Sequence, residues 1–315
     1  MKQLIVNADD FGLTPGVNEG ILDTHKEGIV TSASLMANGS AFDAAVSISH
    51  RTPELGIGVH LNLTTGEPVS PPLGIRSLVD GNGRLHFSVG RLLRALALRR
   101  VDLRHVESEL RAQITKVVNA GILPTHLDGH KHMHLLPGVS DIVIRLAQEF
   151  SIRGIRCPRE IAPDLPALLR GRHSRSAVIK QYLVGRAVSS FAGSFKKKLR
   201  KAGLLTTDHF YGLTETGFLH TRSVLGILGA LPEGVSELMC HPGYFDEDLV
   251  RVRTRLLGQR EVEIRALTAL IVKIVGADRG IRLISYRGLK ADATEPAAVT
   301  RTVAIMSAST IRELL

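Results

Sequence analysis

Residues 4–15 read Leu-Ile-Val-Asn-Ala-Asp-Asp-Phe-Gly-Leu-Thr-Pro, and this stretch indicates the fold class. The almost wholly apolar run Leu4–Ala8 predicts a buried strand. Thr14 is a typical N-cap residue and Pro15 a typical first-turn residue, so we expect a helix to begin there and to continue to Lys26. A short buried strand that leads directly into a helix is the repeating unit of a parallel α/β sheet.

The same alternation continues along the chain. We expect further strands over 29–35, 56–63, 124–130, 155–157, 235–240 and 281–285, and helices over 40–50, 106–117, 139–150, 222–231 and 261–275. Ser40 is the expected N-cap of the second helix. Polar residues fall at the ends of several strands, whereas an open doubly wound sheet would concentrate them at one switch point. This distribution favours an α/β fold of the (β/α) barrel type.

The positive charge is concentrated in one segment. The 315 residues carry a formal net charge of +10, and residues 145–201 hold 14 Lys or Arg against three acids. Such a segment suits an anionic surface such as lipid head groups, although a solvated insertion would have the same composition. Its apolar stretches 177–179 and 182–184 fit a subunit interface or a lipid-facing surface. Aromatic residues make up 4% of the chain and Trp is absent, so we expect no nucleic-acid partner.

The composition also suggests how the chain is divided. We expect residues 1–289 to form the barrel, with a variable basic insertion over 160–205 that is irregular or helical. Residues 66–100 are rich in Pro and Gly and predict a loop with one short element. The Ala-, Thr- and Glu-containing residues 290–315 predict a C-terminal tail.

Two features point to a cytoplasmic protein. Cys157 and Cys240 are the two cysteines, too few for a disulfide framework, so a reducing compartment is expected. The apolar run Leu4–Val6 is too short for a signal peptide, and no run reaches the about 18 apolar residues of a membrane span.

Asp9 and Asp10 stand side by side at the end of the first predicted strand. Successive side chains of a strand alternate, so we expect the two not to point into the core together. Adjacent carboxylates repel each other, and a bound cation would relieve that repulsion. A polar turn in which an Asp caps the next helix is the alternative.

Histidines gather between Thr125 and His134, where four occur in nine residues. On a strand, His126, Asp128 and His130 would share one face. Imidazole and carboxylate ligands suit zinc and similar divalent ions, so a metal site is favoured over a His-rich surface loop.

Two further histidines lie on predicted strands. His60 stands in the apolar stretch 56–63, where a hydrogen-bonded core histidine is the commoner role. His241 follows the strand 235–240 and precedes a Pro-Gly turn, a good position for a general acid or base. Cys240 should alternate away from His241 and belong to the core.

Six blocks of the sequence resemble the YdjC-like carbohydrate deacetylases, in the order of that family. They are NADDFG (7–12), TSASLMANG (31–39), GVHLNLTTGEPV (58–69), THLDGHKHMH (125–134), CHPGY (240–244) and RLISYRGL (282–289). The resemblance implies an irregular (β/α) barrel of the glycoside hydrolase/deacetylase type and one divalent metal ion, Mg²⁺ or Zn²⁺. It also implies removal of the N-acetyl group from an N-acetylglucosamine-type sugar or glycolipid.

Two segments resemble different branches of that family. Residues 231–238 resemble the branch associated with hopanoid biosynthesis, whose substrate would be a glycosyl hopanoid. Residues 239–244 resemble the chitooligosaccharide branch. The sequence therefore leaves the substrate open between a free sugar and a glycolipid.

The resemblance further implies roles for five residues. Asp10, His60 and His130 would bind the metal. Asp9 would be the catalytic base, and His241 would be the acid that protonates the leaving amine.

Four more residues are expected around this centre. The resemblance implies that Arg156 orients the base. Asp128 shares a strand face with His130 and is expected to orient a ligand histidine. His126 and His134 are expected to ligate in place of His130 or to line the sugar site.

Two other functions remain open at this point. A phosphoesterase on the same barrel could use the same ligands, and a second acid cluster for a second metal would support it. A non-catalytic protein that binds lipid surfaces through the basic segment is the other alternative. Peripheral membrane contact and a homodimer are further expectations.

Overall fold

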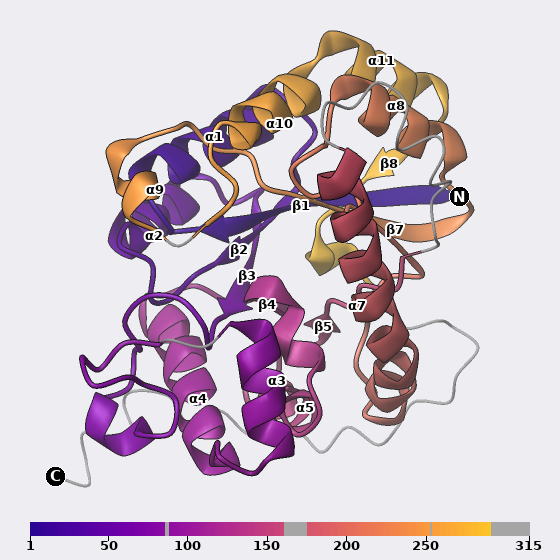
Figure 1. The fold of residues 1–315 in the computed structure, drawn as a ribbon. Helices are drawn as coiled ribbons and strands as arrows, with labels where there is room; N and C mark the ends of the chain where they lie inside the picture. Colours follow the sequence, from indigo (N-terminus) through magenta and orange to yellow (C-terminus); the bar gives the residue numbers. More distant parts are fainter. Residues whose placement is uncertain (86–87, 161–174, 253, 291–315) are drawn as a thin grey trace, which may run out of the picture.

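The computed structural model describes residues 1–85, 88–160, 175–252 and 254–290 (Figure 1). Eight strands of this part of the chain form one sheet, and every ladder between them is parallel. The strands are β1 (Lys2–Phe11), β2 (Ser32–Leu35), β3 (Gly56–Leu61), β4 (His126–Gly129), β5 (Gly154–Ile155), β6 (His209–Tyr211), β7 (Gly234–Cys240) and β8 (Arg282–Leu283).

The sheet curls into an irregular barrel. The strand order is β5-β4-β3-β2-β1-β7-β6, and β8 pairs with the start of β1. Single parallel bridges, Gly154 with Leu205 and Glu160 with Phe210, connect the β5 side of the sheet to the β6 side. The prediction of an irregular (β/α) barrel is therefore confirmed.

Helices surround this sheet on its outside (Figure 1). They are α1 (Pro15–Lys26), α2 (Phe42–Arg51), α3 (Val89–Ala97), α4 (Leu103–Asn119), α5 (Val139–Glu149), α7 (Arg175–Lys201), α8 (Thr221–Ala230), α9 (Glu247–Arg251), α10 (Gln259–Thr268) and α11 (Leu270–Asp278), with the 3-10 helices η1 (Pro72–Ile75), η2 (His130–Leu135) and η3 (Tyr286–Gly288). Because helices cover the sheet, β1 is buried along nearly its whole length, as its apolar sequence predicts.

The first βα unit forms as predicted. The Thr14 side chain accepts a hydrogen bond from the Val17 amide, Pro15 stands in the first turn, and α1 ends at Lys26. The strand ends differ from the predictions by a few residues, and β4 is shorter than the predicted 124–130 because His130 already begins η2.

Two local predictions were wrong, and one strand was missed. Ser40 does not cap α2: its hydroxyl donates to the Leu13 carbonyl, and Ala41 occupies the cap position. The expected helix 261–275 is two helices, because Ala269 has an extended backbone (ψ 126°) between α10 and α11. Strand β6 was not predicted, since its three residues carry no alternating pattern long enough to read.

The basic region contains one long helix, α7, of 27 residues. This confirms helical structure within 175–201, whereas the predicted insertion residues 161–174 and the predicted tail residues 291–315 lie outside the described residues. Within the described residues, no helix is both long and apolar enough to cross a membrane.

Candidate active site

The polar residues of the site meet at the carboxyl ends of the strands, where β1 contributes two neighbouring carboxylates. Asp9 and Asp10 are each only 3% exposed, and both turn toward the site. The expected alternation fails here because Asp10 adopts a positive φ of 68° and the β1–β2 register shifts between Ala8 and Phe11. A non-glycine residue in this backbone region is strained, and such strain is typical of functional sites.

Asp10, His60 and His130 form a group of three potential metal ligands. Asp10 Oδ1 lies 3.1 Å from His130 Nδ1 and 3.6 Å from His60 Nε2. Ligand atoms around tetrahedral zinc, with bonds of about 2.0–2.1 Å, are separated by about 3.3 Å. Asp10 Oδ1 is buried and makes no well-aligned hydrogen bond, and its polar neighbours are the two ring nitrogens of His60 and His130. His130 is partly exposed, which leaves one side of the group open.

The other oxygen of Asp10 is held by a buried arginine. Arg260 Nη2 of α10 lies 2.6 Å from Asp10 Oδ2. Burial alone would raise the pKa of Asp10, but Arg260 and the histidines hold it well below its usual range. Asp10 is therefore ionised at neutral pH and presents one free oxygen to a cation.

Arg156 organises the acids beside this group. It is fully buried, and its guanidinium pairs with both oxygens of Asp9 (2.7 and 2.8 Å), with Asp128 Oδ2 (2.6 Å) and with Glu237 Oε1 (2.8 Å). Tyr286 donates its hydroxyl to the other Glu237 oxygen at 2.5 Å. Bidentate pairing fixes the plane of the Asp9 carboxylate.

His60 is oriented from behind by Asp128. Asp128 Oδ1 lies 2.8 Å from His60 Nδ1, so His60 Nε2 points toward Asp10. Ser34 of β2 donates to the second Asp128 oxygen. Burial would lower the pKa of His60, but the carboxylates of Asp128, Asp9 and Asp10 outweigh burial and raise the pKa to about 9. A carboxylate behind a histidine is the usual support of a metal ligand.

The site carries an excess of negative charge that a divalent cation would balance. The four carboxylates of Asp9, Asp10, Asp128 and Glu237 face the two guanidiniums of Arg156 and Arg260. With His60 neutral, as a bound metal requires, and with Glu237 only partly ionised because burial raises its pKa to about 7, the carboxylates exceed the guanidiniums by one to two charges. Buried charge without compensation is costly, so the donor set fits a doubly charged ion.

His241 directly follows β7, and its ring faces the Asp9 carboxylate. Its Nε2 is 3.9 Å from Asp9 Oδ2, too far for a direct hydrogen bond and suited to a group bound between them. Its backbone amide donates to Glu263 of α10 at 2.6 Å, which fixes the loop after β7. Burial lowers the pKa of His241 to about 4, so the ring is neutral at pH 7.

The other two predicted histidines lie behind the site. His126 stacks on Tyr286 with ring centres 3.8 Å apart and contacts Ser34, and His134 contacts the Arg156 carbonyl. Both are fully or almost fully buried, so neither lines an open surface, and neither is in the group with Asp10.

The structure thus brings Asp9, Asp10, His60, His130, His241, Arg156 and Asp128 together. Sequence reasoning missed the buried residues that hold them, among them Ser34, Glu237, Arg260 and Glu263. Ser34 lies inside the motif at 31–39, and Glu237 lies three residues before the motif at 240–244. A buried charge on β7 was a usable signal for Glu237. Arg260 and Glu263 come from a helix more than 200 residues away from Asp10, and local patterns carry no sign of that contact.

Comparisons with known proteins agree with this architecture. The family model described as YdjC-like protein matches residues 3–273. A carbohydrate deacetylase of Brevibacillus brevis is 36% identical over 293 residues, which cover 91% of this chain and 99% of the relative. A chitooligosaccharide deacetylase of Klebsiella pneumoniae is 35% identical, over 91% of this chain and 98% of that protein.

A solved structure shares the fold. A crystal structure from Enterococcus faecalis V583, of a protein named for cellobiose-phosphate cleavage, matches with a TM-score of 0.69 and 28% identity. The match covers 90% of this chain and 97% of that one. With the family model spanning most of the chain, these similarities place the protein in the YdjC-like family.

Proposed function

We propose that this protein is a metal-dependent deacetylase that removes the acetyl group from an N-acetylated sugar. The observation that carries the proposal is the open group Asp10, His60 and His130 beside a carboxylate, Asp9, that is held rigidly by Arg156. Asp10, His60 and His130 would bind a cation, and Asp9 beside them would transfer protons.

The residues present fit one divalent ion. Asp10, His60 and His130 would hold it, and when bound it would polarise the acetamide carbonyl and lower the pKa of a water. Two imidazole nitrogens and one carboxylate favour Zn²⁺ or a similar ion over Mg²⁺, which prefers oxygen ligands.

Asp9 is the residue placed to accept a proton from the attacking water. Both its oxygens are bound by Arg156, and Oδ1 also accepts from Asn7, so Oδ2 is the oxygen with the freer lone pair. Because Arg156 fixes its orientation, Asp9 needs no rearrangement when a proton is transferred.

His241 is the residue placed to protonate the leaving nitrogen. An amine leaves poorly unless it is protonated, and His241 Nε2 faces Asp9 Oδ2 across a gap of 3.9 Å. Since His241 is neutral at pH 7, it can donate only after it takes up a proton. The proton that Asp9 removes from the water passes from Asp9 Oδ2 to His241 Nε2, and His241 then delivers it to the leaving nitrogen, which leaves Asp9 ionised again.

The substrate class comes from the relatives, two of which are named carbohydrate deacetylase and chitooligosaccharide deacetylase. A two-metal phosphoesterase is less well supported. Within the described ranges, a second group of potential ligands consists of Asp9, His60 and Asp128, and it shares His60 with the first group. Both of its acids are already paired with Arg156, so it is poorly suited to hold a second metal. We further propose a cytoplasmic location, to which the buried, unpaired Cys157 and Cys240 are suited.

The test measures acetate released from N,N′-diacetylchitobiose by metal-stripped protein and by the same protein reconstituted with Zn²⁺. The proposal predicts acetate and a free amine only after reconstitution. The matched variant Asp10→Asn should bind the ion more weakly and release less acetate. Equal acetate release by stripped and reconstituted protein, or none from either with N-acetylated sugars, would overturn the proposal.

A further inference from the structure

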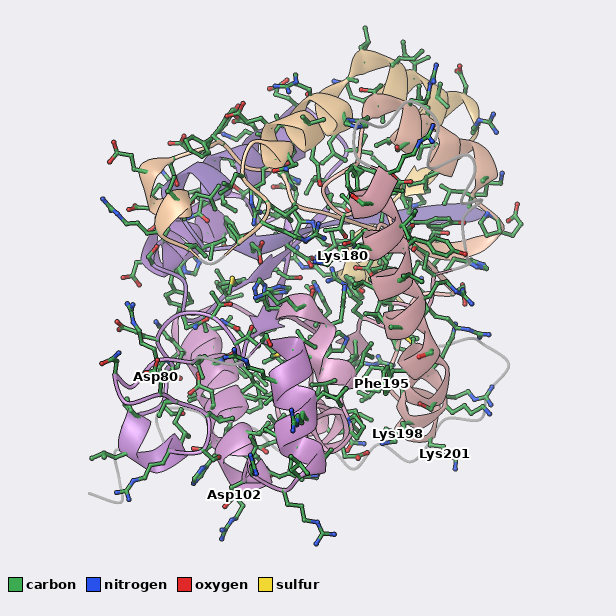
Figure 2. The ribbon with its side chains drawn as sticks, viewed as in Figure 1. Asp80, Asp102, Lys180, Phe195, Lys198 and Lys201 are labelled. Atoms are coloured by element: carbon green, nitrogen blue, oxygen red, sulfur yellow. The ribbon has the colours of Figure 1, made fainter. Side chains whose placement is uncertain are left out.

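The long helix α7 has an unusual charge composition. Its 27 residues, Arg175–Lys201, include five lysines and three arginines and contain no Asp or Glu. One face of the helix is buried against the barrel, where Phe195 packs on the ring of His134 with centres 5.8 Å apart. Figure 2 shows Lys180 toward one end of the helix and Lys198 and Lys201 at the other.

The opposite face of α7 carries large apolar side chains that are exposed. Leu183 is 60% exposed, Val184 46%, Ile179 40% and Phe191 37%. At 3.6 residues per turn these four fall within one arc of about 140°, and Lys180 falls in the same arc. Single exposed apolar residues are ordinary, but a run of them along one helix face marks a contact surface.

The first turns of α7 contact the loop that follows β6, at the end of the sheet where the candidate active site lies. Gln181 donates to the Leu213 carbonyl at 2.5 Å and accepts from Arg255, and Gly185 lies against the Thr214 side chain. Leu213 and Thr214 follow the carboxyl end of β6, and the site lies at the carboxyl ends of the same parallel sheet. The first turns of α7, which carry Ile179, Leu183 and Val184, therefore lie at the same end of the barrel as the mouth of the site. The later turns run toward the other end, where Lys196 donates to the carbonyls of Thr207 and Asp208 just before β6.

We infer that the outer face of α7, defined by Ile179, Leu183, Val184 and Phe191 with Lys180 and Arg186, docks on an anionic lipid surface. A helix with basic residues beside an apolar face lies in the interface of a membrane, where apolar side chains enter the head-group boundary and the basic ones meet anionic lipid. A symmetric contact with a second copy would instead bring two strongly positive helices together. Nucleic acid would leave the apolar residues without a partner.

Docking would have a consequence for the substrate, and this part rests on the proposed deacetylase function. The end of the barrel at which α7 begins would then lie beside the lipid head groups. An N-acetylated sugar attached to a lipid anchor would then be presented to Asp9 and the metal ligands without leaving the bilayer.

The experiment measures sedimentation of the full chain with vesicles of 30% phosphatidylglycerol in phosphatidylcholine, and with pure phosphatidylcholine. The double variant Leu183→Glu/Val184→Glu tests the apolar contact, and Lys180→Ser/Arg186→Ser tests the charge. Leu123→Glu is a control at an apolar residue that is 85% exposed and precedes β4 at the other end of the sheet. Arg91→Ser/Arg100→Ser, on and after α3, is the control for the loss of two charges.

The chain should sediment with the anionic vesicles at least tenfold more strongly than with the neutral ones. Each basic residue near such a surface changes binding about fivefold, so Lys180→Ser/Arg186→Ser should weaken it on the order of 30-fold. The glutamate pair should abolish it, and both controls should bind like the parent chain. All variants should release acetate from soluble diacetylchitobiose at the parent rate, which separates this test from that of the proposed function.

Four results would overturn the inference. The parent chain could fail to sediment with anionic vesicles, or the two α7 variants could bind as the controls do. The third is that the parent chain does not bind vesicles and elutes as a dimer in size-exclusion chromatography, whereas the Leu183→Glu/Val184→Glu variant elutes as a monomer. Binding to a DNA or RNA duplex in place of vesicles would equally contradict it.

Discussion

Asp9→Asn is the substitution that separates the proton-transfer role of Asp9 from the metal-binding role of its neighbours. The change keeps the shape of the side chain but replaces an acceptor oxygen by an NH₂ group that faces the Arg156 guanidinium. Asn cannot take a proton from water, so the general-base contribution of about 10²–10⁴ in rate should disappear, which is about 3–5 kcal/mol in activation free energy. The ligands Asp10 and His60 are untouched, so metal affinity should change by less than about tenfold.

The same substitution should cost some stability. Arg156 loses a bidentate charged pair but keeps Asp128 and Glu237. Loss of hydrogen bonds to a charged group costs about 1.5–3 kcal/mol, so the variant should unfold at lower denaturant concentration and still be folded at 25 °C. The assay is acetate release at saturating Zn²⁺, with Zn²⁺ affinity and urea unfolding measured on the same samples.

Asp128→Asn is the matched control, because Asp128 is also buried against Arg156 but supports His60. Its loss should lower metal affinity by about 10–100-fold, and excess Zn²⁺ should restore most of the activity. If Asp9→Asn keeps more than a tenth of the activity at saturating Zn²⁺, Asp9 is not the base. If it loses the metal as Asp128→Asn does, the division of roles between the two acids is wrong.

The remaining predictions concern pH and backbone packing. In the metal-free fold the pKa of His60 is raised from 6.5 to about 9. The stability that protonated His60 contributes is therefore fully present below about pH 6.5 and is lost as pH rises through 9. Urea unfolding of metal-stripped protein should show the free energy of unfolding decrease by at most about 3 kcal/mol over this range, and an increase would contradict the charge assignment. Zn²⁺ must displace that proton, so its affinity should increase by up to about tenfold per pH unit over the same range, as a competition titration can measure. Gly58→Ala would place a Cβ 2.3 Å from the His126 ring, so it should destabilise the fold by about 1–3 kcal/mol. In Gly226→Ala, on α8, the added Cβ meets no atom within 4 Å, so this variant should stabilise the fold by about 0.4–1 kcal/mol. Equal melting temperatures for these two variants would contradict the close packing behind the site.

Much of the fold could be predicted because its signals are local. The cap at Thr14, Pro15 and the apolar run before them define the first βα unit, and the polar residues at several strand ends predict the barrel. The break at Ala269 was not predictable, because no Gly or Pro marks it. Residues 175–201 of the basic region proved to be a helix, although their few apolar positions gave no clear period.

The candidate site was predictable where its residues stand in motifs and not where distant elements supply them. The motifs contain Asp9, Asp10, His60 and His130, and the structure brings these together. The joint orientation of the two acids depends on the positive φ of Asp10, which no pattern of residue types specifies. Arg260 meets Asp10 across 250 residues, a contact set only by the closure of the barrel.

The most direct test of the central claim counts bound metal and released acetate on one preparation. We predict one Zn²⁺ per chain by elemental analysis, acetate from N,N′-diacetylchitobiose in proportion to that Zn²⁺, and loss of both in a His60→Ala/His130→Ala variant. Acetate release that does not follow the bound Zn²⁺, or a fully loaded protein that releases no acetate from N-acetylated sugars, would contradict the account.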